Sequence, residues 1–251
     1  MLTESQVEQY FEDGYVTPDF KFPEEVILSI QSRHEKLLET HPEYRDYCPA
    51  ILEHDIVFVD YCRNEQILDM VQQLIGRDIA LWNASFFAKP AGNGKATPWH
   101  QDGEYWPISP LATCSVWVAV DDANRENGCL RVIKGSHKNN NLLEHETNSS
   151  KDLTLNLEVK KKEYDESKAV DIVLEKGQIS IHDVFLVHGS EPNTSDKSRR
   201  GMVMRFMPTS SFFDLENASE HFKKFKPEDD ERKIYHMRGI DQCGKNNLVY
   251  V

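Results

Sequence analysis

The pattern of hydrophobic residues changes near residue 79, and this change limits the possible folds more than any other feature. Before it, apolar residues recur every three or four positions, which predicts amphipathic helices. After it, the apolar runs are short, rich in β-branched and aromatic residues, and separated by Gly, Pro and Asn, which is typical of strands and turns. We therefore expect a mostly β fold with flanking α-helices, in which two sheets form a barrel.

The bounds of these elements follow from the same pattern. Helices are predicted over Thr3–Asp13, about Pro23–Thr40 and Asn64–Ile75. Strands are predicted over Ile79–Lys89, Ala112–Val120, Cys129–Ile133, Ala169–Val173, Ile179–His182, Leu186–His188 and Met202–Pro208. We interpret residues 1–251 as one domain, with a helical part over about 1–76, a barrel over about 79–210 and a C-terminal tail over 211–251. The polar residues 139–164 are expected to form a solvated loop or a lid between strands.

The overall charge and the cysteine content argue against several classes of protein. The formal net charge is −13, whereas nucleic-acid binding needs a clustered positive surface. The five cysteines are scattered without a CxxC spacing, which fits a reducing compartment. The N-terminus has neither a basic nor an apolar leader segment, and the chain has no apolar run long enough to span a membrane. We expect a cytoplasmic protein that binds neither nucleic acid nor membranes, and the sequence leaves its oligomeric state open.

Three residues form a candidate metal site. His100 and Asp102 are two positions apart in an extended segment, so their side chains point to the same side. His188 ends a mostly apolar segment and is followed by a turn that can present its ring to a cavity. Two histidines and one carboxylate on three corners of an octahedron form the facial triad of non-haem iron(II) oxygenases. Structural zinc is disfavoured, because it needs four ligands and no cysteines are nearby.

The open positions of such a site need a co-substrate that chelates iron, such as 2-oxoglutarate. Its far carboxylate requires a rigid bidentate donor, which arginine supplies. Arg199 and Arg200 precede the last predicted strand and are expected next to the strand that carries His188. Consecutive residues of a strand point to opposite faces, so only one of the two can serve.

From Trp82 to about Pro208 the sequence resembles the phytanoyl-CoA dioxygenase family of iron(II)/2-oxoglutarate-dependent oxygenases. The resemblance includes Lys89-Pro90, Trp99-His100-Gln101-Asp102, Tyr105-Trp106-Pro107, Asp121-Asp122, Glu126-Asn127-Gly128, Gly135-Ser136-His137 and His188-Gly189-Ser190. It implies a double-stranded β-helix (jelly-roll, cupin-like) fold, and it implies that His100, Asp102 and His188 are the iron ligands.

The resemblance also implies how the co-substrate is bound. Arg199 matches the arginine that binds the far carboxylate, Ser190 donates to the same group, and Gln101 and Trp117 line the co-substrate pocket. The implied reaction consumes 2-oxoglutarate and dioxygen and releases succinate and carbon dioxide. Because Asp102 is present, hydroxylation (or desaturation or ring closure) is favoured over halogenation, in which a small residue replaces this carboxylate.

Candidate substrate contacts lie around the metal motif. His182 is six residues before His188, so continuous strand alternation places both rings on the inner face of the barrel. The segment Glu104-Tyr105-Trp106 follows the metal pair, and Phe87 lies on an earlier strand. Aromatic faces beside a carboxylate favour a small, polar, amine-bearing or zwitterionic substrate, although packing at the barrel rim explains the same residues.

Two other functions remain as alternatives. One is a non-catalytic metal-binding barrel that acts as a binding module, and the other is a cupin-like metal-dependent isomerase or hydrolase. Loss of catalysis would be expected to remove a ligand or the arginine, and an isomerase would have no co-substrate for Ser190 and Arg199 to hold.

Overall fold

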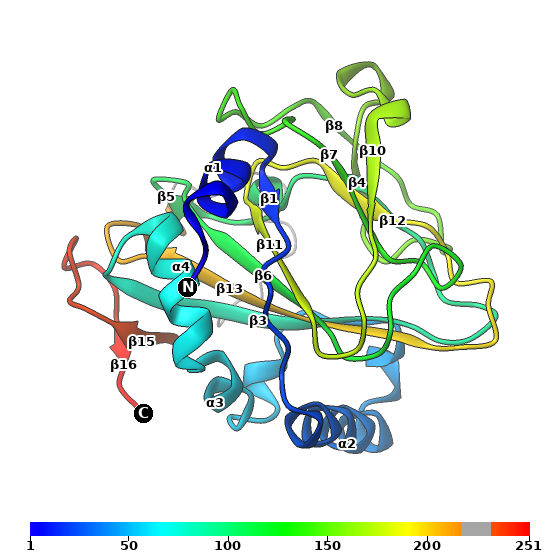
Figure 1. Ribbon diagram of the computed structural model, residues 1–251, viewed down its shortest axis with the longest axis horizontal. Coiled ribbons are helices and arrows are strands. Elements are labelled where there is room, and N and C mark those ends of the chain that lie inside the picture. Colours follow the sequence, from blue (N-terminus) through cyan, green and yellow to red (C-terminus); the bar gives the residue numbers. More distant parts are fainter. Residues whose placement is uncertain (217–231) are drawn as a thin grey trace.

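The computed structural model describes residues 1–216 and 232–251, and its strands form two principal antiparallel sheets (Figure 1). The larger sheet runs in the order β1 (Tyr15–Val16), β11 (Ile179–Asp183), β6 (Cys114–Ala119), β13 (Arg199–Pro208), β3 (Ile79–Lys89), β15 (Ile234–Arg238) and β16 (Leu248–Val249). The strand β2 (Tyr47–Cys48) also pairs with β3, and the pairing of β15 with β16 is parallel. The smaller sheet runs in the order β10 (Ala169–Ile172), β7 (Leu130–Ile133), β12 (His188–Ser190) and β4 (Thr97–His100).

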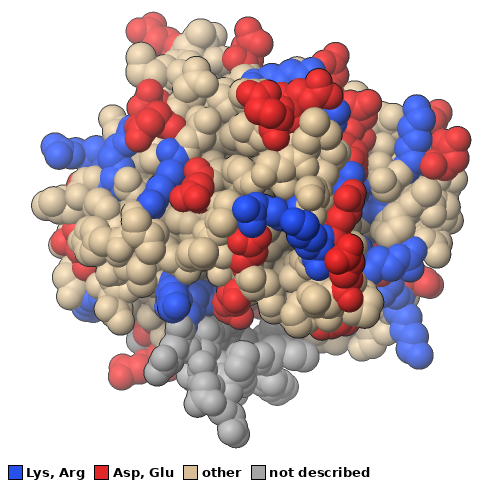
Figure 2. Space-filling model, turned by 90° about the horizontal axis from the view of Figure 1, so that it is seen from below, with Lys and Arg blue, Asp and Glu red and all other residues tan. Residues whose placement is uncertain are grey.

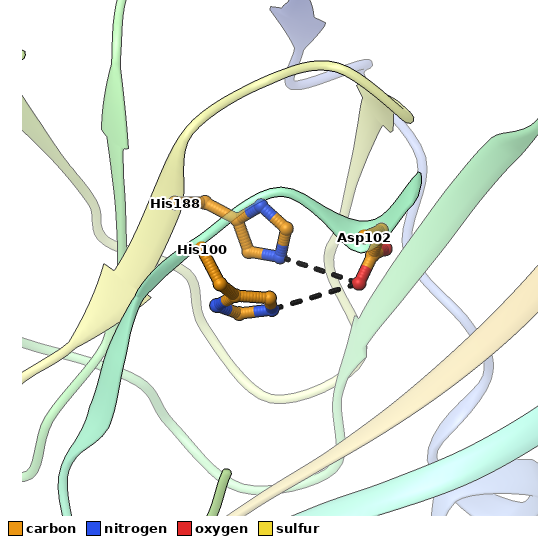
Figure 3. Close-up of side chains that lie close together, drawn as sticks. All are labelled: His100, Asp102 and His188. Carbon is orange, nitrogen blue, oxygen red and sulfur yellow. Dashed lines mark ion pairs between the residues drawn. The ribbon is translucent and has the colours of Figure 1, made fainter. Parts of the chain in front are cut away.

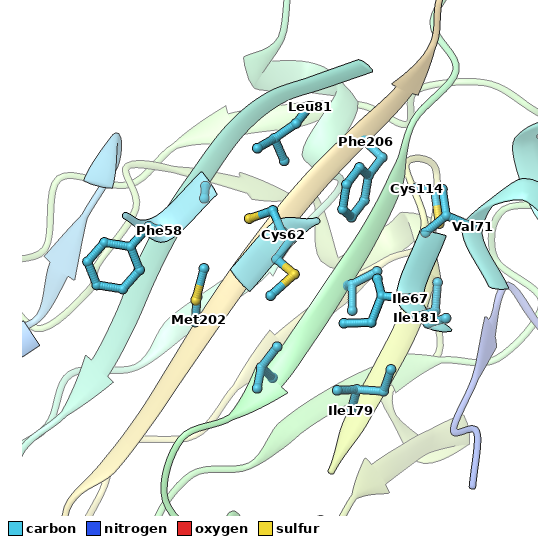
Figure 4. Packing of buried hydrophobic residues seen from close by; sticks show 14 of the residues in the cluster. Phe58, Cys62, Ile67, Val71, Leu81, Cys114, Ile179, Ile181, Met202 and Phe206 are labelled. Atoms are coloured by element: carbon cyan, nitrogen blue, oxygen red, sulfur yellow. The ribbon is translucent and has the colours of Figure 1, made fainter. Parts of the chain in front are cut away.

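The helices α1 (Glu4–Asp13), α2 (Glu24–Thr40), α3 (Phe58–Cys62) and α4 (Glu65–Ile75) pack against the larger sheet. Their apolar side chains and those of the sheet form one hydrophobic cluster. In Figure 4, Phe58 of α3 lies near Met202 of β13, and Ile67 of α4 lies near Ile181 of β11. The predictions of a mostly β fold with flanking helices and of a two-sheet, jelly-roll arrangement are confirmed.

Strand β13 shows how the sequence divides the larger sheet into two faces. Met202, Met204 and Phe206 belong to the hydrophobic cluster with the helices, whereas Val203 and Arg205 line a cavity between the two sheets. Side chains alternate along a strand, so this single segment contributes to both environments. Residues able to contact a ligand are therefore expected on the side of the strand that faces the cavity.

Helix α1 begins and ends where the sequence predicts. The Thr3 hydroxyl accepts a hydrogen bond from the backbone N–H of Gln6 (3.3 Å), and the Gln6 side chain accepts one from the N–H of Thr3 (2.9 Å). Gly14 ends the helix at φ 85°, where a Cβ would lie 2.6 Å from Nδ1 of His137. Glycine is required there for its left-handed backbone and for the close contact.

The segment from Ile179 to His188 departs from the prediction. Strand β11 ends at Asp183, whose carboxylate accepts a hydrogen bond from the N–H of Phe185 (2.8 Å) in a turn. The chain then crosses to the smaller sheet, where β12 begins at His188. The expectation of one continuous alternating face over this segment is therefore wrong.

Two polar regions contain more structure than expected. Within residues 139–164, β8 (His145–Thr147) and β9 (Leu157–Val159) form an antiparallel pair. At the start of the predicted tail, β14 (Phe212–Phe213) pairs with β5 (Ile108–Ser109). In the predicted tail, β15 and β16 extend the larger sheet, whereas residues 217–231 lie outside the described residues.

Basic and acidic side chains are interspersed on the face of the molecule seen in Figure 2. Within residues 1–216 and 232–251, no helix has the length and apolar character needed to cross a bilayer. The cytoplasmic location, the single-domain organisation and the absence of nucleic-acid binding stay predictions.

Candidate metal centre

Three side chains converge where the strands β4 and β12 lie side by side (Figure 3). His100 ends β4, Asp102 begins the following 3-10 turn (Asp102–Tyr105), and His188 begins β12. His188 is the direct cross-strand partner of His100, which brings their rings to a centroid distance of 4.2 Å. The pairing of two strands that are distant in sequence thus adds His188, as a third ligand, to His100 and Asp102.

The hydrogen bonds of the two histidines orient their metal-binding nitrogens. Nδ1 of His100 donates to the carbonyl of Pro98 (2.8 Å), and Nδ1 of His188 donates to the carbonyl of Leu186 (2.9 Å). Because Nδ1 carries the proton in both rings, each Nε2 has a free lone pair. These Nε2 atoms lie 3.6 Å and 3.8 Å from Oδ1 of Asp102.

The electrostatics of the site keep these groups in the forms that bind a metal ion. Burial lowers the pKa of His188 well below its usual value, and the neighbouring His100 lowers it further. Burial opposes ionisation of Asp102, but the neighbouring His100, His182, His188 and Arg205 side chains hold its pKa well below the ordinary value. A neutral imidazole and an ionised carboxylate are the ligand forms.

The donor set fits iron(II) in a facial triad. His100, Asp102 and His188 are buried, and one ligand atom from each lies within 4.8 Å of the others. In the described part of the chain, no other cluster of three or more His, Cys, Asp or Glu side chains is arranged to hold a metal ion. Imidazole and carboxylate suit iron(II), and three ligands leave positions for a chelating co-substrate.

A small cavity opens beside the three ligands. The side of the smaller sheet is lined by Thr97, His100, Asp102, Leu130, His188, Gly189 and Ser190. The side of the larger sheet is lined by Phe87, Trp117, His182, Arg199, Val203 and Arg205. Of the predicted site residues, the structure thus brings the three ligands, Ser190, Arg199, Trp117, His182 and Phe87 together.

Arg199 is a buried cation in the cavity wall without an ion pair among the described residues. Its Nε donates to the carbonyl of Gly128 (3.0 Å), its Nη1 donates to the carbonyl of Phe87 (2.9 Å), and its guanidinium lies 5.5 Å from the ring centre of Trp117. Burial lowers its pKa to about 10. An anion in the cavity would offset this cost.

The position of Arg199 differs from the prediction in one respect. It lies on β13 in the larger sheet, opposite His188 in the smaller sheet, and not on the neighbouring strand. Arg200 points to the other face, where it binds Asp121 (Nε–Oδ2 2.8 Å) and Glu35 (Nη1–Oε1 2.9 Å). Of the two consecutive arginines, Arg199 is therefore the one at the cavity.

Lys89 is a second buried cation at this end of the site, and the sequence pattern assigned it no role. It is the cross-strand partner of Arg199, and its ammonium group donates to the carbonyl of Lys95. Burial, followed by the charge of Arg199, lowers its pKa well below the ordinary value. The pair raises the positive potential at the Arg199 end of the cavity.

His182 reaches the metal centre from the opposite sheet. Its Nε2 lies 3.6 Å from Oδ2 of Asp102, and its ring centre lies 4.7 Å from that of His188. Neither ring nitrogen has a hydrogen-bond partner among the described residues. The two histidines meet because the sheets that carry them face each other, and not through the continuous alternation that was predicted.

Gln101 does not line the cavity, and its predicted role in the co-substrate pocket is corrected. Its amide donates to the carbonyls of Asn141 (3.2 Å) and Phe185 (2.7 Å) and accepts from the N–H of Leu143 (2.7 Å). Alternation along the extended segment turns Gln101 away from His100 and Asp102. It joins three backbone segments behind the metal site.

The structure also places Glu104, Tyr105 and Trp106 outside the cavity lining. The Tyr105 hydroxyl donates to the carbonyl of Leu157 (3.0 Å), and Trp106 packs against Trp82 (ring centres 4.6 Å apart). Oε2 of Glu104 lies 3.9 Å from Nδ1 of His145, and burial raises the pKa of Glu104. Their predicted role as direct substrate contacts is not supported by this arrangement.

The comparison with known families decides where this site belongs. The family model described as Phytanoyl-CoA dioxygenase (PhyH) matches residues 10–201. The chain belongs to the phytanoyl-CoA dioxygenase family. It is 31% identical over 179 residues to a phytanoyl-CoA dioxygenase domain-containing protein 1 homolog of Dictyostelium discoideum, a match that covers 69% of this chain and 64% of the relative. It is 27% identical over 248 residues to the peroxisomal phytanoyl-CoA dioxygenase of Homo sapiens, covering 88% of this chain and 73% of the relative.

Solved structures with the same fold extend this comparison. The non-heme monooxygenase ThoJ in its apo form has a TM-score of 0.74 and 24% identity, covering 98% of this chain and 86% of that protein. EvdO2 from Micromonospora carbonacea var. aurantiaca, complexed with 2-oxoglutarate, has a TM-score of 0.70 and 20% identity, covering 88% of this chain and 96% of that protein. At these identities the likeness shows the fold.

Proposed function

We propose that the protein is an iron(II)- and 2-oxoglutarate-dependent dioxygenase that hydroxylates a small molecule. The observation that carries the proposal is one cavity that contains both a facial triad of His100, Asp102 and His188 and a buried arginine, Arg199, without a carboxylate partner. The first feature fits a metal with open positions, and the second fits the far end of an anionic co-substrate. Membership of the phytanoyl-CoA dioxygenase family supports the same function.

The residues of the chain have distinct tasks in this reaction. His100 and His188 hold iron(II) through Nε2, and Asp102 holds it through its carboxylate. Iron(II), with 2-oxoglutarate and dioxygen, supplies an oxidant that replaces a substrate C–H by C–OH, with release of succinate and carbon dioxide. Ser190 and Arg199 bind the far carboxylate of 2-oxoglutarate, and Trp117 forms the wall beside it.

The shape of the site supports control of water and of the reaction outcome. The three ligands and Arg199 are buried, so the reacting centre lies in a cavity with restricted solvent access. The carboxylate of Asp102 occupies the position that a halogenase would leave for a halide, which favours hydroxylation. His182, beside Asp102 on the facing sheet, lies on the substrate side of the site.

The two rival functions do not account for Arg199. A cupin-like isomerase or hydrolase without a 2-oxo acid has no use for an unpaired buried guanidinium. A non-catalytic binding module would be expected to have lost a metal ligand or the arginine, whereas His100, Asp102, His188 and Arg199 are all present at the cavity. A small polar substrate in the cytoplasm remains part of the proposal.

The first experiment measures succinate formed by the purified protein with iron(II), ascorbate, 2-oxoglutarate and a pool of small organic acids, amines and amino acids. We expect succinate from the wild type and none from His188→Ala, which loses a ligand. Iron binding by both proteins is measured in parallel by calorimetry. A wild-type protein that binds neither iron(II) nor 2-oxoglutarate would exclude the proposed function.

The second experiment tests the co-substrate assignment. Arg199→Ala should weaken 2-oxoglutarate binding by about 10- to 100-fold, the effect of losing charge-assisted hydrogen bonds worth ~1.5–3 kcal/mol, and should leave iron binding unchanged. Arg200→Gln is the matched control, because this neighbouring arginine faces away from the cavity. Equal 2-oxoglutarate affinity in the wild type and Arg199→Ala would contradict the assignment.

A further inference from the structure

A second arginine lines the same cavity and has no part in the scheme above. Arg205 is six residues beyond Arg199 on β13, and alternation turns both side chains to the cavity. The two guanidinium groups start from Cα atoms about 20 Å apart along the strand, so one co-substrate molecule does not use both. Arg205 is 4% exposed.

The surroundings of Arg205 leave one edge of its guanidinium without an acceptor. Nη1 donates to the hydroxyl of Ser85, and the ring of Trp106 lies below the group, with its centre 5.0 Å from Cζ. Nε is buried and has no hydrogen-bond partner among the described residues, and Nη2 has none there either. The Nε–Nη2 edge is the edge that binds a carboxylate through two parallel hydrogen bonds.

The lack of a carboxylate partner separates Arg205 from the arginine on the other face of the strand. Arg200, also on β13, donates to Asp121 and Glu35. Arg205 forms no ion pair with a described residue, and the nearby Asp102 accepts a hydrogen bond from Ser115 (3.2 Å) and belongs to the metal site. A buried charge without a counter-charge is costly, and a ligand of opposite charge removes this cost.

The charges that line the cavity indicate what that ligand is, on the basis of the proposed function. In the sum of charges, iron(II) cancels the two carboxylates of 2-oxoglutarate, and the cavity lining adds the one negative charge of Asp102 to the two positive charges of Arg199 and Arg205. The histidines are neutral in the form that binds the metal. One positive charge is left in this sum. Because Arg199 is assigned to the far carboxylate of 2-oxoglutarate, Arg205, which lies near Asp102, is the guanidinium that remains for a further anion.

We propose that Arg205 binds an anionic group of the primary substrate, which places the substrate among small organic acids with a carboxylate. Trp106 supports the guanidinium from one side and Ser85 fixes its Nη1, so the free edge is held in one orientation. The substrate is anchored at Arg205 with the carbon to be oxidised directed toward the iron. An amine-bearing substrate then fits when it also carries a carboxylate.

The test uses protein loaded with nickel(II), which does not support turnover, and saturated with 2-oxoglutarate. Calorimetry compares benzoate, phenylacetate and octanoate with benzamide, phenylacetamide and octanamide, which have the same shape without the charge. We expect the wild type to bind at least one of the acids tenfold or more tightly than its amide. This preference should disappear in Arg205→Gln, whereas Arg205→Lys, which keeps the charge and loses the planar edge, should retain part of it.

The controls separate this proposal from the proposed function. Arg77→Gln removes an arginine whose side chain is 79% exposed and should bind every probe as the wild type does. Arg205→Gln should bind 2-oxoglutarate with wild-type affinity, because Arg199 is unchanged. Failure of the wild type to bind 2-oxoglutarate would contradict the proposed function itself.

Two results would overturn the role of Arg205 alone. One is normal 2-oxoglutarate binding without a preference for any acid over its amide. The other is a preference for acids that persists in Arg205→Gln, because the metal and not the guanidinium would then bind the carboxylate. If Arg205→Gln does not fold, Arg205→Met, which also removes the charge, takes its place, and an acid preference that persists in Arg205→Met would overturn the proposal for the same reason.

Discussion

The two faces of the larger sheet differ in composition, although the same strands form both. Toward the helices, β13 presents Met202, Met204 and Phe206, which are fully buried in a hydrophobic cluster. Toward the smaller sheet it presents Arg199 and Arg205, which line a cavity and have no ion pair among the described residues. One face is filled and apolar, and the other is hollow and charged.

The difference shows where the stability of the protein arises and where it is reduced. Burial of a large apolar side chain stabilises a fold by about 1.5–3 kcal/mol, and the helix-covered face contains many such residues. An unpaired buried guanidinium and an unfilled cavity both destabilise the folded state. Side chains with such costs are expected where a protein binds ligands, so the two faces should respond differently to substitution.

Adjacent residues of β13 provide the most direct test. Met204→Ala, on the helix-covered face, should lower the free energy of unfolding by about 2–5 kcal/mol and leave 2-oxoglutarate affinity unchanged. Val203→Ala, on the cavity face, should cost about 1–2 kcal/mol, because it removes fewer atoms that already border empty space, and should alter that affinity. Urea unfolding and calorimetry measure the two effects, and the opposite pattern would show that the faces are not separate.

His34 is a buried titratable residue on the helix-covered face, and it should make stability depend on pH. It stacks on Phe86 (ring centres 4.3 Å apart), neither of its ring nitrogens has a partner among the described residues, and burial lowers its pKa to about 4. In the unfolded chain its pKa is about 6.5, so between pH 6.5 and 4 only the unfolded state gains a proton. Stability should be fully present above pH 6.5 and fall by up to about 3 kcal/mol as the pH approaches 4.

The variant His34→Leu should remove this acid sensitivity. Urea unfolding at pH 7 and pH 4.5 measures it, with His41→Leu, whose side chain is 39% exposed, as the control that should behave as the wild type. Equal losses of stability in the wild type and His34→Leu would attribute the acid sensitivity to other groups.

Gly201 tests how closely the cavity face is packed around the co-substrate. A Cβ at this position would lie 2.2 Å from Cζ2 of Trp117, so Gly201→Ala must displace the ring that lies beside Arg199. We expect a loss of stability of about 1–3 kcal/mol and a decrease of 2-oxoglutarate affinity of roughly tenfold. The double variant Gly201→Ala/Trp117→Phe should recover part of the stability, since the smaller ring leaves room for the methyl group, and additive losses would rule out the contact.

The smallest effect is expected far from the cavity, at the start of α1. Thr3→Ala removes the cap of the helix and should lower the free energy of unfolding by about 1 kcal/mol, without an effect on iron or 2-oxoglutarate binding. Glu8→Ala, an exposed change within the same helix, is the control. If Thr3→Ala lost as much stability as Met204→Ala, the loss of the cap would have to disturb the packing of α1 on the larger sheet as well.

Much of the local structure could be predicted from the sequence. The cap at Thr3, the helix stop at Gly14 and the bounds of β3 depend on neighbouring residues alone, and all were predicted correctly. The placement of His100 and Asp102 on one side follows from the alternation of an extended segment over two positions. The motif order from Trp82 to Pro208 was sufficient to identify the family, which the match over residues 10–201 confirms.

The tertiary structure decided which distant residues share the cavity. The sequence pattern placed His182 and His188 on one inner face by continuous alternation, whereas the chain turns after Asp183 and brings the two rings together from facing sheets. Gln101 turned away from the pocket, and Arg205, which the sequence pattern did not single out, faced it. Periodicity reports which side of its own strand a residue occupies, but the sheet that lies opposite is determined by the burial of the whole hydrophobic cluster, which no local pattern contains.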